Sequence, residues 1–121
     1  MKINKKNRKF SVGVNNKIKI NHLADIFLNK NEMITFIDKN KMSYDVVKKN
    51  WGYYATPSIN GRLKNNNFKT ALVSNSQNKL YIMLVEKKKI GKFKKYCKDE
   101  NQKIIIWLDE ETKVKKIFSK S

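Results

Sequence analysis

Two segments of the chain, residues 32–47 and 68–86, each hold two short runs of mostly apolar residues separated by a polar stretch, as in paired β-strands. In the first, two runs rich in β-branched and aromatic residues flank a polar turn at 38–41. In the second, two similar runs flank a five-residue polar loop at 74–78. Because a short polar loop between two strands reverses the chain, each segment is typical of an antiparallel β-hairpin.

A period of three to four residues predicts a helix over residues 88–99. Ile90, Phe93 and Cys97 fall on one stripe of this helix, and lysines take the opposite face. A stripe of this kind is typical of a helix that packs against a sheet.

A shorter helix is predicted at residues 57–65. Thr56 can cap its start, and Pro57 suits the first helical position because an N–H group there would have no helical partner. Ile59 and Leu63 are four residues apart and share a face of this helix.

The other segments give weaker patterns. Residues 1–16 lack a sustained period and are interpreted as a basic, flexible N-terminal arm. Residues 21–29 are ambiguous, although their apolar positions fit one face of a helix. Residues 103–108 fit either a strand or the end of a buried helix, and residues 109–121 form an acidic-then-basic C-terminal tail.

The order hairpin, helix, hairpin, helix predicts the α+β fold class. We expect a small single domain over residues 17–108. In it, one antiparallel sheet is built from the two hairpins, and both helices pack on one of its faces.

The composition is that of a folded domain. Of 121 residues, 40% are hydrophobic and 11% are aromatic, so one core of adequate size is expected. No apolar run reaches the ~18 residues of a membrane helix, and no apolar segment follows the basic N-terminal residues as in a secretory signal. The single cysteine excludes an intramolecular disulfide and a cysteine-based metal cage. These features predict a cytoplasmic protein with no membrane insertion and no cofactor.

The charge is the strongest functional signal. The chain has 28 Lys and Arg against 10 Asp and Glu, a formal net charge of +18. A genome rich in A and T would favour Lys, Asn and Ile, but Glu also has an A-rich codon and only five Glu are present. The excess of positive charge therefore predicts a polyanionic partner, either nucleic acid (DNA or RNA) or an acidic protein surface.

Three groups of basic side chains are candidate contacts for a polyanion. They are Lys5, Lys6, Arg8 and Lys9 in the arm, Arg62 and Lys64 at the short helix, and Lys88, Lys92 and Lys95 on the second helix. Nearly all of the positive charge comes from Lys, which acts as a point charge, whereas bidentate recognition of bases favours Arg. Backbone contacts with weak sequence specificity are therefore expected.

The stretch WGYYATPSINGRL at 51–63 supplies candidates for ring stacking: Trp51, Tyr53 and Tyr54. In an extended strand, Trp51 and Tyr53 would share one face and Tyr54 would take the other. Two interpretations stay open. The rings are exposed and stack on bases or sugars, or Trp51 and Tyr53 cap the core with Gly52 as a bulge.

The short helix and the hairpin after it resemble the recognition helix and wing of winged-helix DNA-binding proteins. The helix carries Ser58, Asn60, Arg62 and Lys64. The resemblance also requires a preceding helix at residues 43–50, where the sequence SYDVV favours a strand instead.

Signals for catalysis are few. His22 has only Asp25, three residues away, as an acidic neighbour, and Cys97 lies on the apolar stripe of a predicted helix. Asp38 and Asp45 lie on one hairpin, but two isolated carboxylates make a poor metal site. The chain has no glycine-rich phosphate loop, no HExxH and no CxxC.

The sequence therefore predicts a non-enzymatic, lysine-rich binding protein that contacts nucleic acid. Two alternatives stay open: a protein-interaction module or small accessory subunit that docks on an acidic partner, and a small-ligand or sugar pocket at residues 51–54. The oligomeric state is not predicted.

Overall fold

The computed structural model describes residues 1–39 and 42–119. The chain forms two units, Met1–Pro57 and Ser58–Ser121. The division falls inside residues 17–108, and the domain boundaries expected from the sequence stay a prediction.

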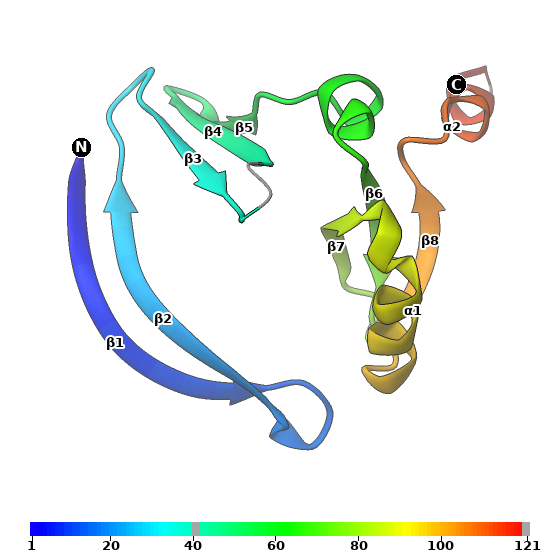
Figure 1. The fold of residues 1–121 in the computed structure, drawn as a ribbon, viewed down its shortest axis with the longest axis horizontal. Coiled ribbons are helices and arrows are strands. Elements are labelled where there is room, and N and C mark those ends of the chain that lie inside the picture. Colours follow the sequence, from blue (N-terminus) through cyan, green and yellow to red (C-terminus); the bar gives the residue numbers. More distant parts are fainter. Residues whose placement is uncertain (40–41, 120–121) are drawn as a thin grey trace. The chain divides into compact units, whose positions relative to one another are not determined.

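The first unit begins with a long two-stranded ribbon, drawn in blue in Figure 1. Strand β1 (Lys2–Val12) pairs antiparallel with β2 (Ile18–Phe27), and a bulge lies between Lys5 and Arg8. Most of the segment expected to be an arm is thus a strand, and residues 21–27 of the ambiguous segment belong to β2 rather than to a helix. The reason is tertiary: each strand satisfies the backbone hydrogen bonds of the other, which a local sequence pattern does not reveal.

A three-stranded sheet completes the first unit. Strands β3 (Met33–Ile37) and β4 (Ser43–Lys49) confirm the predicted hairpin at residues 32–47, although its turn at 38–41 lies partly outside the described residues. Strand β5 (Gly52–Ala55) then pairs with the other edge of β4.

The second unit contains another three-stranded sheet. Strands β6 (Phe68–Ser74) and β7 (Leu80–Glu86) confirm the hairpin predicted at residues 68–86. Strand β8 (Lys103–Trp107) pairs with the free edge of β6 and gives the order β7-β6-β8 (Figure 1). Residues 103–107 are therefore a strand, which periodicity left undecided.

Helix α1 (Ile90–Asp99) confirms the second predicted helix and follows a 3-10 turn at Lys87–Lys89. The ring of Phe93 meets the edge of Trp107 from β8, with centroids 5.9 Å apart. Cys97 is buried, as its place on the apolar stripe predicts. The core of this unit includes Ala71, Val73, Val85 and Leu63.

The first predicted helix is shorter than expected and has a different cap. It is a single π-helical turn, Ile59–Leu63, in which the N–H of Leu63 donates to the carbonyl of Ser58 at 3.1 Å. The Ser58 hydroxyl accepts the Arg62 N–H at 3.2 Å. Thr56 does not act as the cap, because its hydroxyl donates to Asp45 at 3.2 Å. A Cβ atom at Gly61 would collide with Ser58 Oγ, so a larger residue there would displace the hydroxyl that accepts the Arg62 N–H.

The C-terminal segment expected to be a tail contains helix α2 (Glu111–Ser119). Glu111 in its first turn and Lys116 in its last turn complement the helix dipole. The positions after Ser119 lie outside the described residues.

The α+β fold class is confirmed, but the single sheet expected from both hairpins is not formed. The hairpins belong to separate sheets. Strands β5 and β8 pair with β4 and β6 in place of a direct pairing between those two strands. None of the described helices is both long and apolar enough to span a membrane.

Candidate nucleic-acid interface

The three rings of the aromatic stretch lie outside the core. The exposed fractions are 68% for Trp51, 60% for Tyr53 and 43% for Tyr54. Neither Trp51 nor Tyr53 therefore caps the core, and the stacking of the exposed rings on bases or sugars stays a prediction.

The pairing of the rings differs from the alternation expected for a strand. Trp51 stacks on Tyr54, with ring centroids 6.0 Å apart and planes inclined by 21°. Trp51 lies in the turn before β5, and Gly52 has φ of +144°, a conformation that L side chains rarely adopt. The alternation of a strand therefore does not extend back to Trp51.

A lysine lies on the same sheet face as this stack. Tyr54 is opposite Val47 and Gly52 is opposite Lys49. Since directly paired residues share a face, and so do residues two apart in a strand, Lys49 and Tyr54 lie on one side of the sheet. The Lys49 ammonium group donates to Asn31 Oδ1 at 2.7 Å.

The opposite face carries the third ring. Tyr53 is opposite Lys48, and the Lys48 ammonium group lies 4.6 Å from the centre of the Tyr53 ring. This is a cation–π contact. The aromatic stretch thus presents one ring with a cation on one face and two stacked rings with a cation on the other.

The loop that holds Lys49 is fixed to the end of β4. Asn31 has φ of +66° and donates its N–H to the Lys48 carbonyl at 2.7 Å, and the Lys48 N–H returns a bond to the Glu32 carbonyl at 3.0 Å. The Glu32 carboxylate accepts the Asn29 N–H at 2.7 Å. This bond, followed by contact with the Met1 ammonium group, lowers the pKa of Glu32. Sequence reasoning missed the role of Asn31, which only the tertiary contact reveals.

The basic residues predicted in the arm lie along β1, and two of them have partners on β2. Lys6 forms an ion pair with Asp25 at 3.2 Å, and Arg8 Nε donates to His22 Nδ1 at 3.3 Å. Arg8 also lies 4.6 Å from the centre of the Phe10 ring. Lys5 and Lys9 are exposed, which leaves their ammonium groups open to solvent or a ligand.

His22 and Asp25 make the contact that their spacing suggested. His22 Nε2 lies 2.9 Å from Asp25 Oδ1 and 3.1 Å from the Ala24 carbonyl. Both neighbours are acceptors, so Nε2 carries the proton, and Nδ1 is free to accept from Arg8. The cluster joins the two strands beside the bulge.

The lysines predicted on the second helix are all exposed. Lys95 forms an ion pair with Asp99 at 2.9 Å, and the hydrogen bond and charge of Asp99 raise the pKa of Lys95. Lys92 lies on α1, and Lys88 lies in the 3-10 turn before it. Asp99 therefore reduces the value of Lys95 as a phosphate contact relative to these two.

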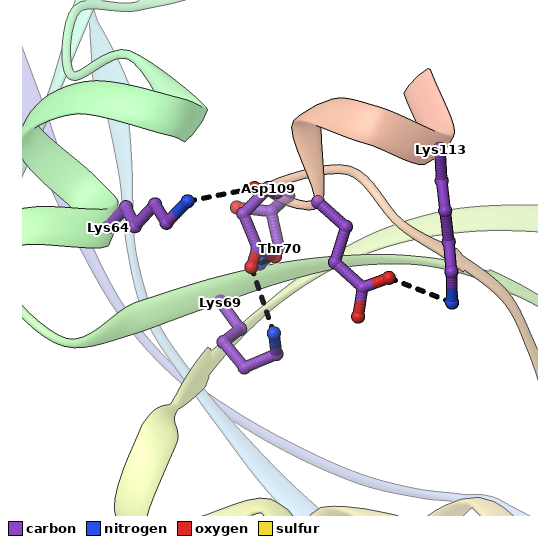
Figure 2. Close-up of polar contacts among 6 residues, drawn as sticks. Lys64, Lys69, Thr70, Asp109 and Lys113 are labelled. Atoms are coloured by element: carbon purple, nitrogen blue, oxygen red, sulfur yellow. Dashed lines mark hydrogen bonds and ion pairs between the residues drawn. The ribbon is translucent and has the colours of Figure 1, made fainter. Parts of the chain in front are cut away.

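Lys64 belongs to a polar network around Asp109, shown in Figure 2. Asp109 is 3% exposed, accepts Lys69 Nζ at 2.9 Å and accepts the Thr70 N–H at 2.9 Å. Lys64 Nζ lies 3.5 Å from the Asp109 carbonyl oxygen. Burial by itself would raise the pKa of Asp109, but the two hydrogen bonds and the charge of Lys69 outweigh it and lower that pKa.

This network connects segments of the second unit and includes Lys64, one of the predicted polyanion contacts. It links β6 to the segment between β8 and α2. Lys64 is therefore partly engaged in the fold, whereas Arg62, also predicted, is an exposed residue of the π-helical turn. Neither Lys69 nor Asp109 was singled out from the sequence.

Of the residues considered for catalysis, His22 and Asp25 meet, whereas Asp38 and Asp45 have separate partners. Asp45 is buried and accepts the hydroxyls of Thr35 and Thr56, while Asp38 accepts the Met42 N–H at the turn of the same hairpin. Burial raises the pKa of the Cys97 thiol. Across residues 1–39 and 42–119, no cluster of three or more His, Cys, Asp or Glu side chains is placed to hold a metal ion.

The winged-helix arrangement is not formed. Residues Ser43–Lys49 are strand β4, where that arrangement requires a helix. The reason is that β4 pairs with β3 and β5 along both of its edges.

The predicted contacts divide between the units. The lysines and arginine of β1 and the rings at 51–54 belong to the first unit, and Arg62, Lys64, Lys88, Lys92 and Lys95 belong to the second. A scan against protein-family models and searches of curated proteins and of solved structures found no match to this chain. Its function is therefore inferred from the geometry.

Proposed function

We propose that this chain is a non-enzymatic, lysine-rich accessory protein that binds nucleic acid through its phosphate backbone with weak sequence specificity. The observation that carries the proposal is the exposure of all three rings at 51–54, with the Lys48 ammonium group 4.6 Å from the centre of the Tyr53 ring and Lys49 on the sheet face of Tyr54. Exposed rings give bases a stacking surface, and nearby lysines neutralise phosphates.

The β1–β2 ribbon supports the same proposal. Residues 1–27 contain seven cationic side chains and one acidic side chain, Asp25. The seven are Lys2, Lys5, Lys6, Arg8, Lys9, Lys17 and Lys19. An extended ribbon with this charge suits a path along a nucleic-acid backbone.

The exposed lysines of the segment before and along α1 add a second basic surface. It holds seven lysines within residues 87–98. Lys89 pairs with Glu86, and Lys95 pairs with Asp99. Because the seven lysines outnumber these two acidic partners, the segment keeps a large excess of positive charge. A cytoplasmic location, where nucleic acid is accessible, completes the proposal.

The salt dependence of binding tests this function. The affinity for a labelled duplex DNA should fall steeply between about 50 and 300 mM NaCl. If about five phosphates are contacted, the slope of log affinity against log salt is near −4 to −5. An affinity that does not change with salt would contradict the proposal.

Charge reversals locate the contact. Lys5→Glu with Lys9→Glu on β1, and Lys92→Glu with Lys95→Glu on α1, should each weaken binding and flatten the slope. Lys115→Glu with Lys116→Glu on α2 changes the net charge equally at positions outside the candidate surfaces. Equal losses for all three pairs would show that only the overall charge matters, which would refute the assigned sites.

One observation favours a second function, docking on another protein. Strand β7 lies at the edge of its sheet, and three consecutive apolar residues on it are exposed: Leu80 by 63%, Tyr81 by 45% and Ile82 by 58%. An exposed apolar edge strand can accept a strand from a partner. A partner that stays bound after nuclease treatment and is lost with Leu80→Lys plus Ile82→Lys would favour this function over the first.

A further inference from the structure

We propose that the Trp51–Tyr54 stack and Lys49 form a site for single-stranded nucleic acid, in which one unpaired base stacks on the exposed Trp51 ring and an adjacent phosphate meets the Lys49 ammonium group. The inference rests on the proposed function and adds the form of nucleic acid that is recognised. We call this group of three residues the stacking site.

The two rings are arranged to receive a base. Tyr54 supports Trp51 from one side at 6.0 Å, while Trp51 itself is 68% exposed. Trp51 is thus held by a neighbour and still offers ring surface to a ligand. A ring held in this way loses less conformational freedom when a base stacks on it.

A positive charge is held on the sheet face that carries Tyr54. Lys49 lies on the same sheet face as Tyr54, and its ammonium group is held by the side-chain oxygen of Asn31 at 2.7 Å. An amide positions the ammonium group without neutralising it. A cation on the same face as a stacking ring suits the alternation of base and phosphate along a polynucleotide strand.

Only some forms of nucleic acid can use such a site. In a duplex the bases are stacked on one another and present only their edges to a protein. A ring can stack on a base only where the base is unpaired, as in a single strand, a loop or a free end. The stacking site therefore favours single strands, whereas the basic ribbon and the α1 lysines contact the phosphates of single strands and duplexes alike.

The fluorescence of Trp51 tests the inference directly. The chain has two tryptophans, and Trp107 contacts Phe93 in the other unit, so Trp107→Phe leaves Trp51 as the sole reporter. A single-stranded DNA dodecamer and its RNA counterpart should each be tested against the duplex of the same sequence. Quenching by either single strand, with little change for the duplex, is the expected result.

Substitution of the rings gives the second readout. Trp51→Ala should lower affinity for the single strand about fivefold to a hundredfold and should change affinity for the duplex less than twofold. The matched control is Phe36→Ala, which removes a ring of similar exposure, 57%, from the same sheet. The control should alter neither affinity, and circular dichroism should show that both variants are folded.

The outcomes separate the two proposals. A chain that binds single strands and duplex equally, with no effect of Trp51→Ala on either, would overturn the stacking site and leave the proposed function standing. A chain that binds neither form would overturn both. Loss of binding to both forms in Trp51→Ala, with the fold intact, would also overturn the preference for single strands.

Discussion

At the scale of single residues, Asp109 is a buried carboxylate that connects two segments of the second unit. It is 3% exposed and is compensated by Lys69 at 2.9 Å and by the Thr70 N–H at 2.9 Å. Removal of one partner from a buried ion pair costs roughly 3 to 5 kcal/mol. The cost should be smaller here, because the Lys69 side chain keeps 20% exposure and can still reach water.

Asp109→Asn should therefore lower the free energy of unfolding by about 2 to 3 kcal/mol. The measurement is urea unfolding followed by Trp107 fluorescence in a Trp51→Phe background. The matched control is Asp99→Asn, which breaks the exposed pair with Lys95 and should cost far less, because water screens a surface pair. Equal costs for the two variants would show that the Asp109 network contributes no more than a surface pair.

The lowered pKa of Asp109 also predicts how stability depends on pH. Its pKa in the folded chain lies below the ordinary value of 3.8, so on acidification the unfolded chain takes up this proton first. The stabilisation is complete above about pH 3.8 and is lost as the pH falls through the folded-state pKa. The urea concentration at the midpoint of unfolding should decrease as the pH is lowered from 7 to 2, mainly in this acidic window. The decrease should be smaller for Asp109→Asn. An identical fall in both proteins would contradict the assignment.

At the scale of elements, the β1–β2 ribbon is the least expected part of the fold. An isolated two-stranded hairpin is only marginally stable in water. This ribbon has an apolar row on one face, formed across the strands by Val12 opposite Ile18 and Phe10 opposite Ile20. Cross-strand pairs of this kind stabilise a ribbon by roughly 0.2 to 1 kcal/mol each.

Hydrogen exchange should distinguish the ribbon from a flexible arm. Paired amides of β1 should exchange more slowly than those of an unstructured peptide of the same sequence, but faster than those of β6. Strand β6 is paired on both edges and contains the fully buried Val73. Exchange of β1 amides at the rate of the unstructured peptide would contradict the ribbon.

The elements also show which parts of the fold a local sequence pattern can predict. The hairpins at 32–47 and 68–86 and the helix at 88–99 follow from periodicity, because each is made by contacts within one short segment. The Trp51–Tyr54 stack does not follow, because it depends on the conformation of Gly52. The contact between Lys69 and Asp109 spans forty residues of sequence and is equally invisible to a local pattern.

At the scale of the whole molecule, net positive charge dominates the electrostatics. A formal net charge of +18 on 121 residues creates repulsion that is greater in the folded chain than in the expanded unfolded one. Salt screens this repulsion, with a Debye length of about 10 Å at 0.1 M.

The melting temperature should therefore rise by several degrees between about 20 and 300 mM NaCl. The cause is loss of repulsion, so Lys5→Glu plus Lys9→Glu, at two exposed positions of β1, should raise the melting temperature at low salt and reduce the gain from salt. Thermal melts followed by circular dichroism would measure both effects. A melting temperature that stays constant or falls over this range would show that repulsion does not limit stability.

The sequence by itself determined the α+β class, the hairpins, the helix at 88–99 and the excess of positive charge, because these depend on short-range periodicity and on composition. Only the tertiary structure decided that the hairpins lie in separate sheets, that residues 2–12 form a strand, and that Trp51 pairs with Tyr54 on the sheet face of Lys49. These features depend on which strand edges meet and on one backbone conformation at Gly52. A local pattern of apolar and polar residues encodes neither, because strand pairing joins separate segments and the pattern carries no information about the φ angle of a glycine.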